Sequence, residues 1–300
     1  MSELPVIAAV DGSEDSLRAL DWAVDAARRR AAPLRVVHVR QYAAWTQPGA
    51  PVTVPPGDVE DQVLDDVRAH LARRGEVPET EYLGIDGAVG VALPELGDSA
   101  QLIVLGSRGR GGFASLLLGS NGVAVSRDAP CPVVVVPRPD RTVDDAPEVE
   151  PGRRVVVGLN VDSPDDSTLA FAFAEAARRD ARLHVVAGYP WPIQTWNTPG
   201  EILPPALDQE AIASETRTLA EGSLAAHRER HPAVRADLFT VPGDVAGNIV
   251  AASKDAELTV VGRHRRRLLA PAPMLGSVTH AVLLHAASPV AVIPAEPLEE

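Results

Sequence analysis

The chain has 300 residues, of which 45% are hydrophobic and 23% charged, a composition typical of globular proteins and a length sufficient for two domains. Aromatic residues make up only 4%, so the cores must consist mainly of Val, Leu, Ile and Ala, and base stacking on aromatic side chains is not expected. Lys and Arg number 28 against 41 Asp and Glu, a formal net charge of −13, which disfavours general binding to nucleic acid.

The sequence contains one cysteine, Cys131, which excludes an internal disulfide and a cysteine-rich zinc site and suits a reducing compartment. The N-terminal residues carry no basic segment, and Asp11 interrupts their apolar stretch, so we expect no signal peptide. No apolar run reaches the roughly 18 residues that a membrane-spanning helix needs. We therefore expect a soluble, cytoplasmic protein that does not associate with membranes.

The sequence repeats itself, and this repetition indicates two domains of the same fold. Three segments of the first half recur in the second half with similar residues in the same order. These pairs are 5–11 with 154–160, 100–106 with 256–262, and 129–137 with 286–294. Between the halves, a polar, acidic stretch with several prolines is typical of an exposed linker. We predict a first domain over residues 1–138, a linker over 139–152 and a second domain over 153–296.

Within the first half, short apolar runs alternate with longer, helix-like stretches, as strands buried on both faces of a parallel sheet require. In chain order, the expected strands cover 6–10, 34–39, a weak segment near 82–83, 102–105 and 133–136. The expected helices cover 15–30, 59–74, 89–96 and 120–127, and Ser13 is the expected N-cap of the first. This alternation predicts an α/β fold: two repeated doubly wound domains, each with a five-stranded, mainly parallel sheet flanked by helices.

A glycine-rich loop follows the expected fourth strand. From Gly106 to Ser120 it reads glycine, two residues, glycine, nine residues, glycine and serine. Glycines let the backbone approach an anion and supply positive φ in a tight curve. The helix that starts at Ser120 directs free N–H groups and the positive end of its dipole to the same place. Because the loop and Asp11 both follow the carboxyl ends of parallel strands, they lie at the edge where open α/β sheets bind ligands, and the arrangement suits a triphosphate.

Other glycine motifs do not fit this loop. A P-loop needs a lysine, and the only lysine of the chain is Lys254. The dinucleotide-binding fingerprint follows the first strand of a domain rather than the fourth. Leu118 stands where a Gly-x-Ser-x-Gly nucleophile elbow has its first glycine. We therefore assign no catalytic residue.

Three motifs together resemble those of the universal stress protein family in its tandem form, with two family domains in one chain. They are Val-Asp-Gly-Ser at 10–13, the loop just described, and Pro-Val-Val-Val-Val-Pro at 132–137, and the resemblance covers nearly all of both halves. It implies that the first domain binds ATP. The residues that the resemblance assigns to adenine, ribose and phosphates are Ala9, Val10, Asp11, Val39, Gly106, Ser107, Arg108, Gly109, Gly119, Ser120 and Asn121. Mg²⁺ often accompanies ATP in such proteins, but no dedicated cage of carboxylates is visible, so we assign no metal ligand.

The second half departs from this pattern in two places. In its loop, Arg265 replaces the second glycine, and ten residues rather than nine precede Gly276. Asn160 stands at the position of Asp11, although a shift of register would let Asp162 serve instead. We therefore expect the first domain to hold the nucleotide and the second domain to stabilise or regulate it.

Two further features allow more than one interpretation. The basic run 263–267 fits a phosphate or polyanion site and a solvated loop about equally. His227 and His231 lie four residues apart on an expected helix, a spacing that could seat a metal ion. Since no third ligand is identifiable, we interpret them as surface histidines.

Three functions remain open. The leading one is an ATP-binding stress-response or regulatory protein with little or no catalytic turnover, because the loop and Asp11 suffice for it. A weak ATPase or phosphotransferase also requires a positioned base, a metal clamp and a cation at the leaving phosphate, which only Arg108 or Arg110 could supply. The third is a scaffold that acts through protein contacts without a nucleotide.

The expected partners are ATP, an unknown regulatory protein and further copies of the chain. The last strand of each half, 133–136 and 290–293, could lie at a sheet edge, and such edges invite pairing. In the family that the chain resembles, such strands commonly mediate domain pairing, and the resemblance therefore implies that the two halves pair. We also expect whole chains to self-associate.

Overall fold

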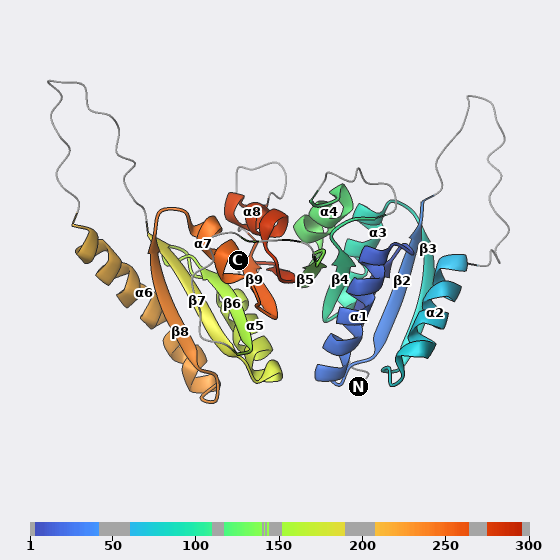
Figure 1. Cartoon of the computed structure of the whole chain (residues 1–300), viewed down its shortest axis with the longest axis horizontal. Helices are drawn as coiled ribbons and strands as arrows, with labels where there is room; N and C mark the ends of the chain where they lie inside the picture. Colours follow the sequence, from blue (N-terminus) through green and yellow to red (C-terminus); the bar gives the residue numbers. More distant parts are fainter. Residues whose placement is uncertain are drawn as a thin grey trace, which may run out of the picture. The chain divides into compact units, whose positions relative to one another are not determined.

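The computed structural model describes residues 4–41, 61–109, 117–139, 141, 143, 152–189, 208–263 and 275–295. The chain divides into two compact units, Met1–Arg138 and Pro139–Glu300. Each unit contains a parallel sheet flanked by helices (Figure 1). The predicted α/β fold class is confirmed.

In the first unit the elements follow the predicted order. They are β1 (Val6–Val10), α1 (Glu14–Arg29), β2 (Leu34–Arg40), α2 (Gln62–Arg74), β3 (Thr80–Asp86), α3 (Val89–Glu95), the short 3₁₀ helix η1 (Gly97–Ser99), β4 (Leu102–Gly106), α4 (Ser120–Asp128) and β5 (Val133–Val136). The strand order is β3-β2-β1-β4-β5, and neighbouring strands run parallel. Consecutive residues of β1, from Val6 to Ala8, are fully buried. Such burial requires helices on both faces, and right-handed crossovers place α1 and α2 opposite α3 and α4.

Local chemistry explains where these elements begin. Ser13 caps α1 as predicted, since its Oγ accepts a hydrogen bond from the Ser16 N–H at 3.2 Å. Asp61 caps α2 in the same way, and the first residues of the predicted second helix lie outside the described residues. Strand β3 is longer than the weak segment predicted near 82–83. It lies at the end of the strand order with only partial burial, so its sequence lacks a continuous apolar run.

The second unit repeats this architecture. Its elements are β6 (Arg154–Leu159), α5 (Asp166–Arg179), β7 (Arg182–Tyr189), α6 (Gln209–Arg230), β8 (Ala236–Pro242), α7 (Val245–Ala252), β9 (Leu258–Gly262), α8 (Ser277–His285) and β10 (Val290–Ile293). The strand order is β8-β7-β6-β9-β10, again with parallel neighbours. No described helix is both long and apolar enough to cross a membrane.

The interpretation of both histidines of α6 as surface residues is wrong for His227. Its side chain is 1% exposed and stacks on Phe173 of α5, with ring centroids 5.4 Å apart. Its Nε2 lies 2.9 Å from an Asp166 oxygen, and burial lowers the pKa of His227. His231 stacks on the same Phe173. Both rings therefore pack against α5. Among the described residues no group of three His, Cys, Asp or Glu side chains could hold a metal ion.

A second buried histidine, His184 of β7, stacks on Phe239 of β8 with ring centroids 3.9 Å apart and an interplanar angle of 7°. Burial, together with the nearby Arg154 and Arg182, lowers the pKa of His184 to about 4, although Asp237 opposes the shift. The ring is therefore neutral in the folded protein at pH 7. In the unfolded chain the same group takes up a proton near its ordinary pKa of 6.5.

This difference predicts a loss of stability in acid. Between pH 6.5 and pH 4 the unfolded chain binds a proton at His184 that the folded chain does not, so the free energy of unfolding falls as pH falls, by at most about 1.4 kcal/mol per pH unit. His184→Phe keeps a stacking ring without a titrating group and removes this part of the pH dependence. Urea titrations of both proteins from pH 7 to pH 4.5 check the prediction, and equal losses in the two proteins would contradict it.

Candidate functional site

Most of the predicted site residues lie at the carboxyl edge of the first sheet. Ala9 and Val10 end β1, Asp11 follows it, and Val39 lies in β2 one residue beyond His38, the partner of Val10. Gly106 ends β4, and Ser107, Arg108 and Gly109 follow, while Gly119, Ser120 and Asn121 begin α4. Residues 42–60 and 110–116, which include Arg110, lie outside the described residues.

A tight turn fixes the Asp11 carboxylate at this edge. The turn passes through Gly12, whose φ is +77°, a value that side-chain-bearing residues rarely adopt. The Asp11 Oδ1 accepts hydrogen bonds from the Ser13 N–H at 3.0 Å and from the Ser13 hydroxyl at 2.6 Å. Ser13 in turn caps α1, so the carboxylate orientation is coupled to the start of that helix.

The loops after β1 and β4 meet at Asp11. A Cβ added to Gly109 would lie 2.6 Å from the Asp11 Oδ2, so the backbone of the second loop passes directly against the carboxylate. The N–H of Gly119 donates to the Ser107 carbonyl at 2.8 Å, which holds the start of α4 against the end of β4. Residues that are distant in sequence thus converge on one place.

The first turn of α4 is open to an anion. Its N-cap is Gly119, and no side chain of the described residues caps it, whereas side chains cap the longer helices α1 and α2. Ser120 and Asn121 are exposed at this end. Uncapped N–H groups, the positive end of the helix dipole and the Ser120 hydroxyl together favour a negatively charged ligand.

A buried carboxylate lies behind this loop and was missed in the sequence. Asp15 of α1 is 3% exposed, and the Arg138 Nε donates to it at 3.1 Å. The Arg108 Nε lies 3.9 Å away, and the Ser107 hydroxyl donates to Asp15 at 3.5 Å. Arg18 of the same helix also pairs with Asp15. The predicted site residues Ser107 and Arg108 are therefore anchored to Asp15, and no local motif marks a carboxylate in a first helical turn as special.

The described glycines of the loop do not adopt the positive φ that was expected for such glycines. Gly106, Gly109 and Gly119 are absent from the described glycines with positive φ. A Cβ on Gly106 would lie 2.7 Å from the backbone of Asp15, so this glycine permits close packing of α1 on β4. A Cβ on Gly119 would meet only ordinary contacts, the nearest at 3.7 Å from the Ser107 oxygen. Of these three, Gly119 alone is free of a structural reason to lack a side chain.

The second unit has a cavity of about 580 Å³ at the corresponding edge of its sheet, a size that suits a small-molecule ligand. Its lining comes from the ends of β6, β7 and β9 and from the starts of α5 and α8, with part of α7. The residues equivalent to predicted site residues of the first unit are Gly158, Leu159, Asn160, Gly188, Gly262, Arg263, Gly276 and Val278.

Strand register establishes this equivalence. Val6 pairs with Leu34 and Leu102, and Val155 pairs with Leu183 and Leu258, which places Asn160 at the position of Asp11. The Asn160 Oδ1 accepts a hydrogen bond from the Asp162 N–H at 3.1 Å, just as Asp11 accepts from the Ser13 N–H. The alternative in which Asp162 takes the place of Asp11 is therefore wrong. Arg265 lies outside the described residues.

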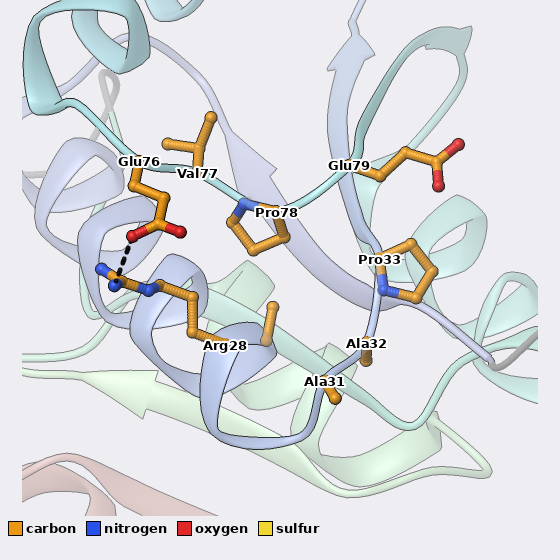
Figure 2. A pocket seen from close by; sticks show the side chains of 9 residues that line it. Arg28, Ala31, Ala32, Pro33, Glu76, Val77, Pro78 and Glu79 are labelled. Atoms are coloured by element: carbon orange, nitrogen blue, oxygen red, sulfur yellow. Dashed lines mark hydrogen bonds and ion pairs between the residues drawn. The ribbon is translucent and has the colours of Figure 1, made fainter.

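Figure 2 shows a different pocket of the first unit, of about 420 Å³, near the amino-terminal ends of β2 and β3. Pro33 and Pro78 line it together with the end of α1. Its charged groups are Arg28, paired with Glu76 at 3.2 Å, and Glu79. Because carboxylates dominate and the pocket lies at the opposite end of the strands from Asp11, it is not part of the candidate site.

Comparisons with known proteins agree with this architecture. A model of the universal stress protein family matches residues 4–137 and again residues 152–294. Universal stress protein Rv2005c of Mycobacterium tuberculosis is 33% identical over 298 residues, covering 96% of each chain. Universal stress protein Rv2623 of the same species is 31% identical over 307 residues, covering 97% of this chain and 96% of the relative. A solved universal stress protein of Archaeoglobus fulgidus, 18% identical, has a TM-score of 0.66 and covers 98% of this chain and 99% of its own, a similarity of fold.

The different surroundings of Gly106 and Gly119 predict effects of different size on stability. Gly106→Ala forces its Cβ against the backbone of α1 and should lower the free energy of unfolding by about 1–3 kcal/mol. Gly119→Ala has space and an extended backbone, with φ −79° and ψ 154°, so it should cost no more than the roughly 0.5–1 kcal/mol by which glycine is preferred to alanine at an N-cap. Urea titrations measure both, and a Gly119→Ala protein as unstable as Gly106→Ala would contradict the packing analysis.

Proposed function

The chain belongs to the universal stress protein family, and we propose that it is an ATP-binding regulatory protein of the stress response whose first unit holds the nucleotide with little or no turnover. The observation that carries the proposal is the uncapped start of α4, held against β4 beside the Asp11 carboxylate. The positive end of the α4 dipole, which suits phosphates, and the Asp11 carboxylate, which suits a nucleoside, belong to one edge of one sheet.

The two ends of this site have different chemistry. Asp11 accepts hydrogen bonds and so suits ribose hydroxyls or the adenine amine, with the backbone of Ala9, Val10 and Val39 beside the base. The N–H groups of α4, the Ser120 hydroxyl and the Asn121 amide suit phosphate oxygens. In this proposal Gly109 and Gly119 let the backbone approach the ligand closely.

The surroundings of the loop support binding rather than turnover. Phosphoryl transfer needs a positioned base and a cation at the leaving phosphate. Asp15 is the carboxylate nearest to Arg108 among the described contacts, but it is buried and engaged by Arg138, so it is poorly placed to activate water. The described residues hold no cluster for an all-protein metal site, and Mg²⁺ would be held mainly by the phosphates themselves.

The second unit is assigned a stabilising or regulatory role. Its cavity has the neutral Asn160 in place of Asp11, and the carboxylate that lines it, Asp165, is engaged as the N-cap of α5. We further propose that the protein acts in the cytoplasm, self-associates and contacts a regulatory protein partner.

Light scattering of the purified chain tests self-association, which predicts a mass above the 31.6 kDa of one chain.

Calorimetric titration of the nucleotide-stripped protein with ATP and Mg²⁺ tests the assignment. We expect one site per chain, with little phosphate release over hours of incubation. Two equivalent sites would overturn the asymmetry between the units. Steady phosphate release would favour the ATPase or phosphotransferase, and the absence of binding would favour the scaffold.

Two variants separate the two ends of the site. Asp11→Ala removes acceptors for the nucleoside and should weaken ATP, ADP and adenosine alike, by about tenfold for a loss of roughly 1.4 kcal/mol. Gly119→Ala crowds the phosphates and should weaken ATP much more than adenosine. Asn160→Ala in the second unit is the matched control and should leave the affinities unchanged. If Asp11→Ala weakens only ATP, the assignment of Asp11 to the nucleoside is wrong.

A further inference from the structure

The second unit has another cavity, of about 720 Å³, that shares no lining residue with the cavity at the carboxyl edge. Helix α7 separates the two: Val245 and Ile249 face the first, whereas Asn248 and Ala252 face this one. Strands β7 and β8 form much of its lining, and α6 contributes at the side. We call this cavity the basic groove.

Cations cluster at one end of the basic groove. Arg154 begins β6 and pairs in register with Arg182, which begins β7. Arg235 directly precedes β8, and its carbonyl accepts from the Leu183 N–H at 2.9 Å. Three adjacent parallel strands thus each bring one arginine to the groove at their amino-terminal ends. Because parallel strands are in register here, the three side chains form a row.

Two more arginines reach the groove from α6, Arg217 and Arg228. The lining carboxylates are Glu221, which pairs with Arg228, and Asp237, which lies 3.0 Å from Arg235. Five arginines therefore face two carboxylates, in a protein whose overall charge is −13. The excess of positive charge is local to this groove.

Arg154 is the most buried member of the row. Its Nη2 donates to the Lys254 carbonyl, while its buried Nε has no hydrogen-bond partner among the described residues. Burial lowers the pKa of Arg154, with Arg182 adding to the shift and Asp255 opposing it. A buried guanidinium beside a second one is stabilised by an anion that accepts from both.

An apolar platform lies next to the row. The stacked rings of His184 and Phe239 line the groove with Val186, and Phe239 remains 42% exposed. A platform of this kind favours a ligand with a flat or apolar part beside its charges. The groove volume lies within the range of small-molecule sites.

The first unit has no arginine row at the equivalent described positions. There the carbonyl of Glu79 accepts from the Leu34 N–H, as that of Arg235 accepts from the Leu183 N–H. Pro33 and Glu79 therefore stand where the second unit has Arg182 and Arg235, and Figure 2 shows both in the pocket that Glu76 also lines. The arginine row is not a requirement of the fold, since the same fold forms without it.

We propose that the basic groove of the second unit binds a small, multiply charged anion, with its phosphate or carboxylate groups on Arg154, Arg182 and Arg235 and its remainder against the ring of Phe239. The guanidinium fork matches the oxygens of both kinds of group. This site is independent of the ATP site proposed for the first unit, and it gives the second unit a ligand of its own.

Titration of the full chain with inorganic pyrophosphate, and separately with citrate, tests the proposal. We expect one site per chain for at least one of the two, and the tighter ligand identifies phosphate or carboxylate as the preferred chemistry. The double variant Arg182→Gln with Arg235→Gln should weaken binding at least tenfold. Arg153→Gln is the matched control, since Arg153 neighbours the row, does not line the groove and pairs instead with Glu257.

A second readout separates this groove from the start of α4. Proton NMR of the His184 ring during the titration should show its pKa rising on binding, because the added negative charge favours the protonated ring. Gly119→Ala should leave pyrophosphate affinity unchanged. The proposal is overturned if neither anion binds, if the double variant binds as tightly as the parent, or if Gly119→Ala abolishes binding.

Discussion

The parallel pairing of β1 with β4 brings the loop after β1, which carries Asp11, next to the loop after β4, which carries Gly109. The chain leaves β1 toward β2 on one side and returns to β4 on the other. The helices that follow β1 and β4 therefore lie on opposite faces of the sheet, and the loops that lead to them border the same space. The space between them is where Asp11 and Gly109 meet. The second unit obeys the same constraint through β6 and β9, and its cavity lies at the equivalent point.

Two requirements overlap in the glycine-rich loop. Gly106 lacks a side chain because α1 packs directly on the end of β4, and this contact also buries Asp15 where it holds Arg108. Gly119 has no such neighbour among the described residues, and in the proposed site it is where the backbone approaches the phosphates. One glycine pattern in the sequence thus meets a packing requirement at Gly106 and, under the proposal, a binding requirement at Gly119.

The two units show how much can change on one backbone. At the carboxyl edge Asn160 keeps the turn-stabilising hydrogen bond of Asp11 without its charge. At the amino-terminal end of the strands, Pro33 and Glu79 in one unit correspond to Arg182 and Arg235 in the other. Neither change disturbs the sheet, because both positions lie at strand ends where side chains are not part of the core. The side chains at the sheet edges therefore differ between the units while the buried strands stay alike.

The sequence by itself determined the repeat, the buried strands, the cap at Ser13 and the glycine spacing before α4, because these depend on neighbours within a few residues. It did not reveal the anchoring of Arg108 by Asp15, the burial of His227 or the arginine row of the basic groove. Each of these joins side chains from elements far apart in the chain, and a row such as Arg154, Arg182 and Arg235 exists only once three strands are in register. Local pattern sets the elements, whereas tertiary contacts decide which charges face one another.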